Sequence, residues 1–182
     1  MILQANGEFA EKYESKDLKL KNIVQALNEL DDIDAMFKYY PIDICDENRM
    51  QKLFNDLRDK YGRINGIIHC AGVTDGNILK NESEKTIKKV LLPKVFGTYL
   101  LDKLTCNDDL DLFVMCSSAI TLTGKISGLA YTTANTYLDA FSDYRKALGK
   151  NVLCIDWASW QETGMIKNTK INENKEIFEM LK

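Results

Sequence analysis

Short apolar runs alternate with longer stretches of helical periodicity along most of the chain. Three apolar runs have the length and β-branched content of buried strands, and they cover residues 64–70, 110–116 and 151–157. Helical spacing occupies residues 83–104, with an interruption expected at Pro93, and residues 129–148. Buried strands separated by helices predict an α/β fold with a parallel sheet that carries helices on both faces.

The same alternation extends toward the start of the chain. Residues 36–40 predict a strand that ends near Asp43, and Asp46 is expected to cap the helix that follows. The apolar positions of this helix recur at helical spacing, as Leu53, Phe54, Leu57 and Tyr61. Gly62 is expected to end the helix.

The pattern divides the chain into three unequal parts. Residues 1–35 are the weakest, with a possible strand at 2–5 and a possible helix at 17–30, and residues 36–166 hold the alternating core. Residues 167–182 are polar and are expected to form an incomplete lid or C-terminal segment. A chain of 182 residues has the length of one domain and can bury a sizeable core.

Composition and charge exclude several classes of function. The chain is 45% hydrophobic and 28% charged, which is ordinary for a globular protein. Its net charge is −3 and its lysines are scattered, so we expect no binding to nucleic acid. No apolar run approaches the roughly 18 residues of a membrane helix, and no signal peptide opens the chain. We therefore expect no membrane association and a cytoplasmic location.

Cysteine and histidine content bears on redox and metal chemistry. The five cysteines are odd in number and form no CxxC pair. Several lie in apolar strand-like runs, so we expect buried free thiols in a reducing cytosol. With a single histidine in the chain, we expect no metal site.

Candidate catalytic side chains gather in the second half of the chain. Ser118 follows an apolar strand, and ligands of open α/β sheets bind beyond the carboxyl ends of strands. Tyr131 and Asn135 are four residues apart on one predicted helix and therefore share a face. A tyrosine there can protonate the alkoxide that forms when hydride reaches a carbonyl carbon, while the serine hydroxyl binds the carbonyl oxygen. The combination predicts carbonyl reduction with a nicotinamide cofactor.

Lys94 could assist this tyrosine if the fold brings the two together. A tyrosine has an unperturbed pKa of about 10, and a nearby ammonium lowers it by favouring the phenolate. In this interpretation Asn135 holds a water or the lysine in place. Simpler interpretations stay open for each residue taken alone: Ser118 as a turn or helix-cap serine, Lys94 as a solvated surface lysine, and Asn135 as a polar residue of a helix face.

Taken together, Lys94, Ser118, Tyr131 and Asn135 resemble the active-site tetrad of ketoreductase domains in modular polyketide synthases. That family is a branch of the short-chain dehydrogenase/reductases in which the usual lysine and asparagine positions are exchanged. The resemblance covers about residues 36–166. It runs through the segments His69–Val73, Phe113–Ser118 and Ile155–Trp160, with Gly164 and Met165 after them.

The resemblance implies a Rossmann-like fold and a specific reaction. A β-ketoacyl thioester would be reduced to a β-hydroxyacyl thioester by NADPH, with the substrate presented on the phosphopantetheine arm of an acyl carrier protein. Asp43 is implied to contact the adenine ring, although a strand-end cap explains this residue equally well. Ala71 and Gly72 are implied to line the cofactor cleft.

Departures from the family pattern concern the cofactor. The family's first strand, glycine-rich loop and first helix would precede Met1, so we expect an N-terminally truncated domain that has lost most of its cofactor affinity. If residues 2–5 form the second strand, Asn6 stands where relatives often carry an arginine for the 2′-phosphate. The product configuration is not indicated: Gly76 replaces the second aspartate of a Leu-Asp-Asp motif, and Thr123 stands at the tryptophan position of the other type.

Two alternatives to an active ketoreductase follow from these residues. The first is a truncated or split fragment without independent activity, which would need other synthase domains or a missing N-terminal half. The non-catalytic structural subdomains of such synthases lack the tetrad, which disfavours that version of a fragment. The second is a free-standing short-chain dehydrogenase, which Asn135 disfavours because lysine is usual at this position.

Overall fold

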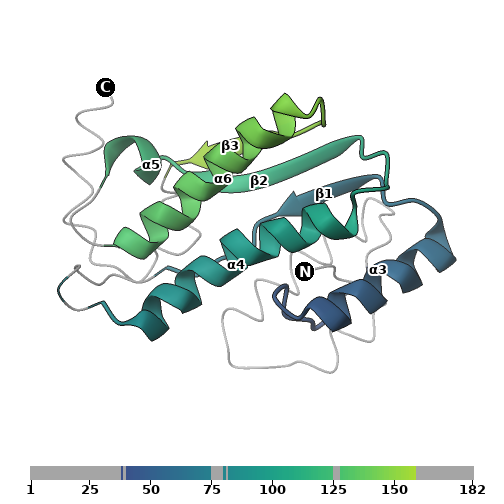
Figure 1. The fold of residues 1–182 in the computed structure, drawn as a ribbon, viewed down its shortest axis with the longest axis horizontal. Helices are drawn as coiled ribbons and strands as arrows, with labels where there is room; N and C mark the ends of the chain where they lie inside the picture. Colours follow the sequence, from purple (N-terminus) through teal and green to yellow (C-terminus); the bar gives the residue numbers. More distant parts are fainter. Residues whose placement is uncertain (1–37, 39, 75–79, 81, 125–127, 159–182) are drawn as a thin grey trace, which may run out of the picture.

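The sheet of this protein is built from three parallel strands. The computed structural model describes residues 38, 40–74, 80, 82–124 and 128–158. The strands lie in the order β1-β2-β3, as Figure 1 shows, and they are β1 (Gly66–His69), β2 (Leu112–Ser118) and β3 (Leu153–Trp157). The three strands predicted from the apolar runs are confirmed, with each end placed to within two residues.

Helices connect the strands in the predicted alternation. They are α3 (Glu47–Tyr61), α4 (Glu84–Leu104), the short α5 (Ile120–Thr123) and α6 (Leu129–Ala147). The interruption expected at Pro93 is wrong, because α4 continues through it. A proline costs its helix one backbone hydrogen bond. In α4 this cost is offset by residues packed on both sides of it, since Val90 and Gly97 are both buried.

Strand register explains why one face of the sheet is apolar and buried. The Cα of Ile67 lies opposite that of Phe113, and Met115 lies opposite Cys154. Ile67, Phe113 and Met115 are buried beneath helices, whereas Ile68 on the opposite face of β1 is 69% exposed. The helices α3, α4 and α6 pack on the same face (Figure 1), and the described residues do not test the helices expected on the other face.

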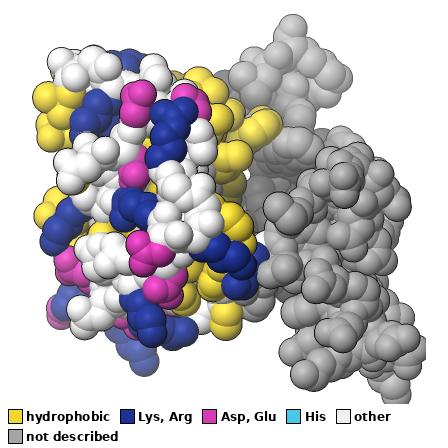
Figure 2. Space-filling view, turned by 90° about the vertical axis from the view of Figure 1, so that its right-hand side faces the viewer, with side chains coloured by type: hydrophobic (Ala, Val, Ile, Leu, Met, Phe, Trp, Pro, Cys, Tyr) yellow, Lys and Arg dark blue, Asp and Glu magenta, His cyan; other side chains and the backbone are white. Residues whose placement is uncertain are grey.

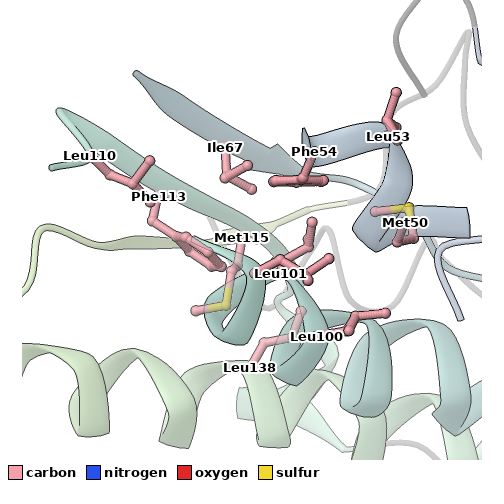
Figure 3. Close-up of a cluster of buried hydrophobic side chains, with 11 residues drawn as sticks. Met50, Leu53, Phe54, Ile67, Leu100, Leu101, Leu110, Phe113, Met115 and Leu138 are labelled. Carbon is pink, nitrogen blue, oxygen red and sulfur yellow. The ribbon is translucent and has the colours of Figure 1, made fainter. Parts of the chain in front are cut away.

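The core lies between this sheet face and the helices, as Figure 3 shows. Its buried members come from α3, β1, α4, β2 and α6, and they are Met50, Leu53, Phe54, Ile67, Leu100, Leu101, Leu104, Leu110, Phe113, Met115 and Leu138. Leu100, Phe113 and Leu138 are completely buried. Each completely buried side chain of this size contributes about 1.5–3 kcal/mol through removal of apolar area from water. This packing fixes α4 and α6 over β2.

A buried ion pair also joins α4 to α6. Arg145 of α6 is 3% exposed and bonds the carboxylate of Asp102 on α4, and its guanidinium lies 4.1 Å from the centre of the Phe113 ring. On the molecular surface, charges of both signs are interspersed at the end where the strands begin, as Figure 2 shows.

The segment before α3 differs in part from the prediction. Asp46 caps α3 as expected, since its carboxylate accepts a hydrogen bond from the Arg49 N–H at 3.1 Å. Gly62 ends the helix with a φ of 83°, which glycine adopts without steric cost. The strand expected to end near Asp43 is wrong for residues 40–43, which are not in a strand. Most of its remaining residues, and the elements expected at 2–5, 17–30 and 167–182, lie outside the described residues.

The expectation of buried thiols is also wrong. All five cysteines are free, but none is buried: Cys70 and Cys106 are exposed and the others are half-buried. Strand runs of apolar residues place alternate side chains on opposite faces, and only one face of this sheet lies under the described helices. None of the described helices is both long and apolar enough to cross a bilayer.

The Asp46 cap gives a first test of the fold. Replacing Asp46 by Ala removes the acceptor for the Arg49 N–H and is expected to lower the free energy of unfolding by about 1 kcal/mol. Urea unfolding followed by circular dichroism measures the change. The exposed Asn48→Ala variant, in the same helical turn, is the matched control and should change it by less than about 0.5 kcal/mol. Equal losses in the two variants would contradict the assigned cap.

Candidate functional site

The candidate site lies where the parallel strands end. Cys70, Ala71 and Gly72 follow β1, and Ser118 is the last residue of β2. The start of α6 and the short α5 lie at the same end of the sheet in Figure 1. Crevices at the carboxyl ends of parallel strands are where open α/β sheets bind their ligands.

Lys94 is a buried cation at the centre of this region. Its side chain comes from α4, the residue is 3% exposed, and its Nζ donates a hydrogen bond to the carbonyl of Cys116 on β2 at 2.7 Å. Burial lowers the pKa of Lys94 below its ordinary value of 10.5, an effect that nearby groups, Asp139 among them, oppose. The interpretation of Lys94 as a solvated surface lysine is therefore wrong.

Gly72 and Lys94 are in direct contact. A Cβ built on Gly72 would lie 2.8 Å from Cε of Lys94, closer than carbon atoms can approach. The absence of a side chain at Gly72 thus makes room for the lysine to reach the end of β2. Glycine is required here by close approach, and this contact brings the segment after β1 against the buried cation.

Ser118 is half-buried at the end of β2 and faces the start of α5. Its Oγ accepts a hydrogen bond from the Ile120 N–H, with a long nitrogen–oxygen distance of 3.4 Å. This contact supports its interpretation as a turn serine. It does not use the hydroxyl hydrogen, so the same side chain can still donate to a ligand oxygen.

Tyr131 and Asn135 lie in the first turns of α6, which packs on α4. Tyr131 is half-buried and packs against a small apolar cluster that includes Val90, one helical turn before Lys94. Asn135 is completely buried, and its amide Nδ2 donates to the backbone carbonyl of Tyr131 at 2.7 Å. The helix therefore carries both side chains toward the part of α4 that holds the buried lysine.

Asn135 also connects α6 to the strand that ends at Ser118. The hydroxyl of Ser117 donates to the backbone carbonyl of Asn135 at 3.3 Å. The side-chain Oδ1 of Asn135 is buried and has no hydrogen-bond partner among the described residues. A buried acceptor without a partner is costly, so this oxygen offers a place for a water molecule or an N–H donor.

The structure brings some of the predicted site residues close to one another without joining all of them by hydrogen bonds. Within the described part of the chain, the side chains of Lys94, Ser118 and Tyr131 share no direct hydrogen bond. Asp43 is exposed, and its carboxylate accepts from the Cys45 N–H at 2.9 Å. The neighbouring Ile44 packs against α4 at Gly97, where a built Cβ would lie 3.3 Å from the Ile44 side chain. Ala71 is half-buried beside Gly72.

Three polar residues of α6 and β3 were missed by the sequence interpretation, and two of them, Asp139 and Cys154, act on the charge of Lys94. Asp139 on α6 and Cys154 and Asp156 on β3 place one ligand atom each within 4.8 Å of one another. The Cys154 thiol donates to the Asp139 carboxylate at 3.4 Å. Burial raises the pKa of the Asp156 carboxyl, and Asp139 raises it further. Asp139 follows Asn135 by four residues on one helix, and this spacing is the signal that could have found it.

The KR domain family matches most of the chain. The model of this family, described as the KR domain, matches residues 13–162. Polyketide synthase PksN of Bacillus subtilis (strain 168) is 33% identical over 158 residues, which are 84% of this chain and 3% of PksN. Polyketide synthase GfsA of Streptomyces halstedii is 34% identical over 142 residues, 78% of this chain and 2% of GfsA. The chain thus spans a few per cent of the length of these relatives.

Several solved structures of ketoreductases have the same fold as this chain. The crystal structure of a ketoreductase domain from the bacillaene assembly line has a TM-score of 0.79 and 26% identity, covering 92% of this chain and 40% of that one. An N-terminal ketoreductase from the macrolactin assembly line has a TM-score of 0.71 and 33% identity, covering 81% and 30%. The three-stranded sheet and its helices therefore form part of a Rossmann-like ketoreductase fold.

The buried imidazole of His69 makes the stability of this region sensitive to acid. Burial, followed by the charge of Lys94, lowers the pKa of His69 from 6.5 to about 4. The unfolded chain then binds one more proton than the folded chain between these values, so stability falls as the pH drops from 6.5 to 4. The loss is on the order of 3 kcal/mol.

Replacing His69 by Leu should remove this part of the acid dependence. We expect the free energy of unfolding of the wild-type chain to fall more steeply between pH 6.5 and 4 than that of His69→Leu, as measured by urea unfolding at each pH. His69 is the only histidine, and the two proteins carry the same carboxyl groups, so the difference between the two pH profiles reports on His69. Parallel pH profiles would show that His69 titrates normally.

The contact between Gly72 and Lys94 gives a second test. Gly72→Ala places a methyl group against Cε of Lys94 and should break the bond from Nζ to the Cys116 carbonyl. We expect the free energy of unfolding to fall by about 1–3 kcal/mol. The control is the same change in a Lys94→Ala background, where the methyl group has room. A loss of the same size in both backgrounds would contradict the contact.

Proposed function

Because the chain belongs to the KR domain family of polyketide synthases, we propose that it carries the proton-transfer part of an NADPH-dependent ketoreductase. The substrate would be a β-ketoacyl thioester and the product a β-hydroxyacyl thioester. The proposal is supported most directly by the burial of Lys94 at the carboxyl end of the sheet. A lysine with its Nζ bonded to a strand carbonyl is costly to bury, and its charge can act on a neighbouring acid.

In this proposal Tyr131 is the proton donor. Its phenol hydroxyl gives a proton to the carbonyl oxygen of the substrate as negative charge develops there. The hydroxyl of Ser118 donates a hydrogen bond to the same oxygen, because its hydrogen is not used by the Ile120 contact. Two donors aimed at one oxygen would stabilise the alkoxide before the proton arrives.

Lys94 and Asn135 support this proton transfer. The ammonium of Lys94 favours the phenolate that Tyr131 becomes after it loses its proton. Asp139 favours the charged form of Lys94 and so opposes the effect of burial. Asn135, whose Oδ1 has no partner among the described residues, would hold a water molecule or the lysine in position.

The residues of the described part fit the chemistry that NADPH requires. NADPH supplies a hydride to the carbonyl carbon when bound, and the carbonyl oxygen then needs one proton. In this proposal the phenol of Tyr131 supplies that proton, the hydroxyl of Ser118 hydrogen-bonds the oxygen, and the cation of Lys94 stabilises the phenolate that is left. Ala71 and Gly72 would line the cofactor cleft, and Asp43, which is exposed near α4, would contact the adenine ring.

The partners proposed for the site follow from the size of the relatives. The relatives are synthases of which this chain matches 2–3%. We propose that an acyl carrier protein presents the substrate on a phosphopantetheine arm. The glycine-rich loop that anchors the cofactor pyrophosphate would come from other synthase domains or an N-terminal half. The alternative is a fragment that keeps the site but holds no cofactor alone.

Cofactor binding separates these two possibilities. We expect the 182-residue chain alone to bind NADPH weakly or not at all, and to gain affinity when an N-terminal half with the glycine-rich loop is supplied. Fluorescence titration with NADPH measures both. Submicromolar affinity of the chain alone would show that the loop is not required. No gain on complementation would favour the inactive fragment.

Replacement of Tyr131 by Phe tests the proton donor. In the complemented enzyme, we expect the loss of the hydroxyl to lower kcat for a small β-ketothioester by a factor of about 100 or more, measured by NADPH oxidation. Tyr144→Phe, a change at an exposed tyrosine of the same helix, is the control and should leave kcat unchanged. Unchanged turnover in Tyr131→Phe would remove this residue from the acid role.

A further inference from the structure

Two cysteines meet near the carboxyl ends of neighbouring strands, on the side of the sheet away from the helices: Cys70 directly follows β1, and Cys116 lies inside β2. His69 of β1 lies opposite Met115 of β2, so the next residues along both strands, Cys70 and Cys116, are also opposite each other. Alternation places both on the same face as the exposed Ile68, because His69 and Met115 point into the core. Their Sγ atoms are 3.0 Å apart.

We propose that Cys70 and Cys116 are a redox modification site that forms a reversible intrachain disulfide with low-molecular-weight disulfides of the glutathione type. The proposal is independent of the reductase function. It rests on strand register and on the separation of the two sulfur atoms. Bond formation needs the sulfur atoms to close from 3.0 Å to about 2.05 Å. Cys70 lies just beyond the last residue of β1 and can make this movement, whereas Cys116 is paired with Ile155 inside β2.

The exposure of Cys70 and the lack of another thiol in contact with it favour this pair over the other thiols. Cys70 is exposed and can meet an oxidant in solution, whereas Cys116 is half-buried beside it on the neighbouring strand. Cys154 donates to Asp139, and Cys45 lies beside Asp43. Among the described residues, no other two thiols are in contact, so an oxidant that reacts at Cys70 has one resolving thiol within reach.

The reaction balances as two thiol–disulfide exchanges. The thiolate of Cys70 attacks the external disulfide, forms a mixed disulfide and releases one external thiol. The thiolate of Cys116 then attacks the Cys70 sulfur and releases the second external thiol. The protein loses two hydrogen atoms, the two cysteines are oxidised, and one external disulfide is reduced to two thiols.

The protonation state of the Cys70 thiol sets the rate of the first exchange. Cys70 is exposed as a residue, but its thiol is partly shielded from water. This desolvation, followed by the hydrogen bond to Cys116, raises the pKa of Cys70 to about 11, and the charge of Lys94 opposes this shift. Little thiolate is then present at neutral pH, so exchange is slow there. We expect the rate of disulfide formation to rise about tenfold per unit between pH 7 and 9.

The disulfide would join the two segments that contact Lys94 in the candidate site. The carbonyl that accepts the Lys94 hydrogen bond belongs to Cys116, and Ala71 and Gly72 directly follow Cys70. Both ends of the new bond therefore belong to segments that hold Lys94 in place.

Mass spectrometry of the full chain tests the proposal. After incubation with oxidised glutathione and trapping with an alkylating agent, we expect a species that has lost two hydrogen atoms and a digest in which Cys70 is joined to Cys116. The five cysteines allow ten pairings, so the same reaction in urea should give a mixture of them. Native chain that yields the same mixture, or separate glutathione adducts on Cys70 and Cys116, would overturn the proposal.

Single substitutions provide the second measurement. Cys116→Ser should stop the reaction at a glutathione adduct on Cys70, and Cys70→Ser should abolish the species that has lost two hydrogen atoms. Cys106→Ser is the matched control at another exposed cysteine and should leave the Cys70–Cys116 bond unchanged. Loss of the bond in Cys106→Ser, or its persistence in Cys70→Ser, would assign the disulfide to other residues. The digest of the wild-type chain decides the question even if a variant fails to fold.

Discussion

The hydrogen bond from the Lys94 ammonium to the Cys116 carbonyl is the constraint on which the candidate site depends. It joins α4 to the last residues of β2 in a place where the lysine is nearly inaccessible to water. Burying an ammonium costs free energy, so hydrogen bonds and opposite charges in the surrounding structure must offset this cost. The requirement for glycine at Gly72 follows directly, because a side chain there would occupy the space of the lysine.

Helix α6 completes the site because it is held at both ends. Near its start, the carbonyl of Asn135 accepts the Ser117 hydroxyl of β2. Near its end, Arg145 bonds Asp102 of α4 and lies over the Phe113 ring. These contacts fix the helix that carries Tyr131 over the helix that carries Lys94. The relative placement of Tyr131 and the buried Lys94 thus follows from core packing and from these two polar contacts.

Periodicity was enough to predict β1, β2 and β3 and the helices α3, α4 and α6, since buried positions must recur with the spacing of each element. It was wrong for residues 40–43, which are not in a strand. It failed at Pro93, because the packing of α4 on both sides of the proline outweighs a local penalty that the sequence alone suggests. It also failed for the cysteines, because an apolar strand run does not reveal which face is covered.

The candidate site was only partly predictable from the sequence. Lys94, Ser118, Tyr131 and Asn135 were found by resemblance to a family, and no local pattern shows that Lys94 is buried. That burial depends on Gly72, on the end of β2 and on α4, which come together only in the fold. Asp139, Cys154 and Asp156 were missed because each residue taken alone has the pattern of an ordinary helix or strand position. Their proximity arises from packing of α6 on β3.

The pKa of Lys94 is the most direct test of this account, because it measures the burial and the charge balance of the lysine without requiring turnover. Nuclear magnetic resonance of the chain labelled with ¹³C at lysine Cε, with Lys94→Met used to assign the signal, gives this value. We predict a pKa below the ordinary 10.5, because burial outweighs the opposing effect of the nearby thiols and Asp139. A pKa at or above 10.5 would contradict it.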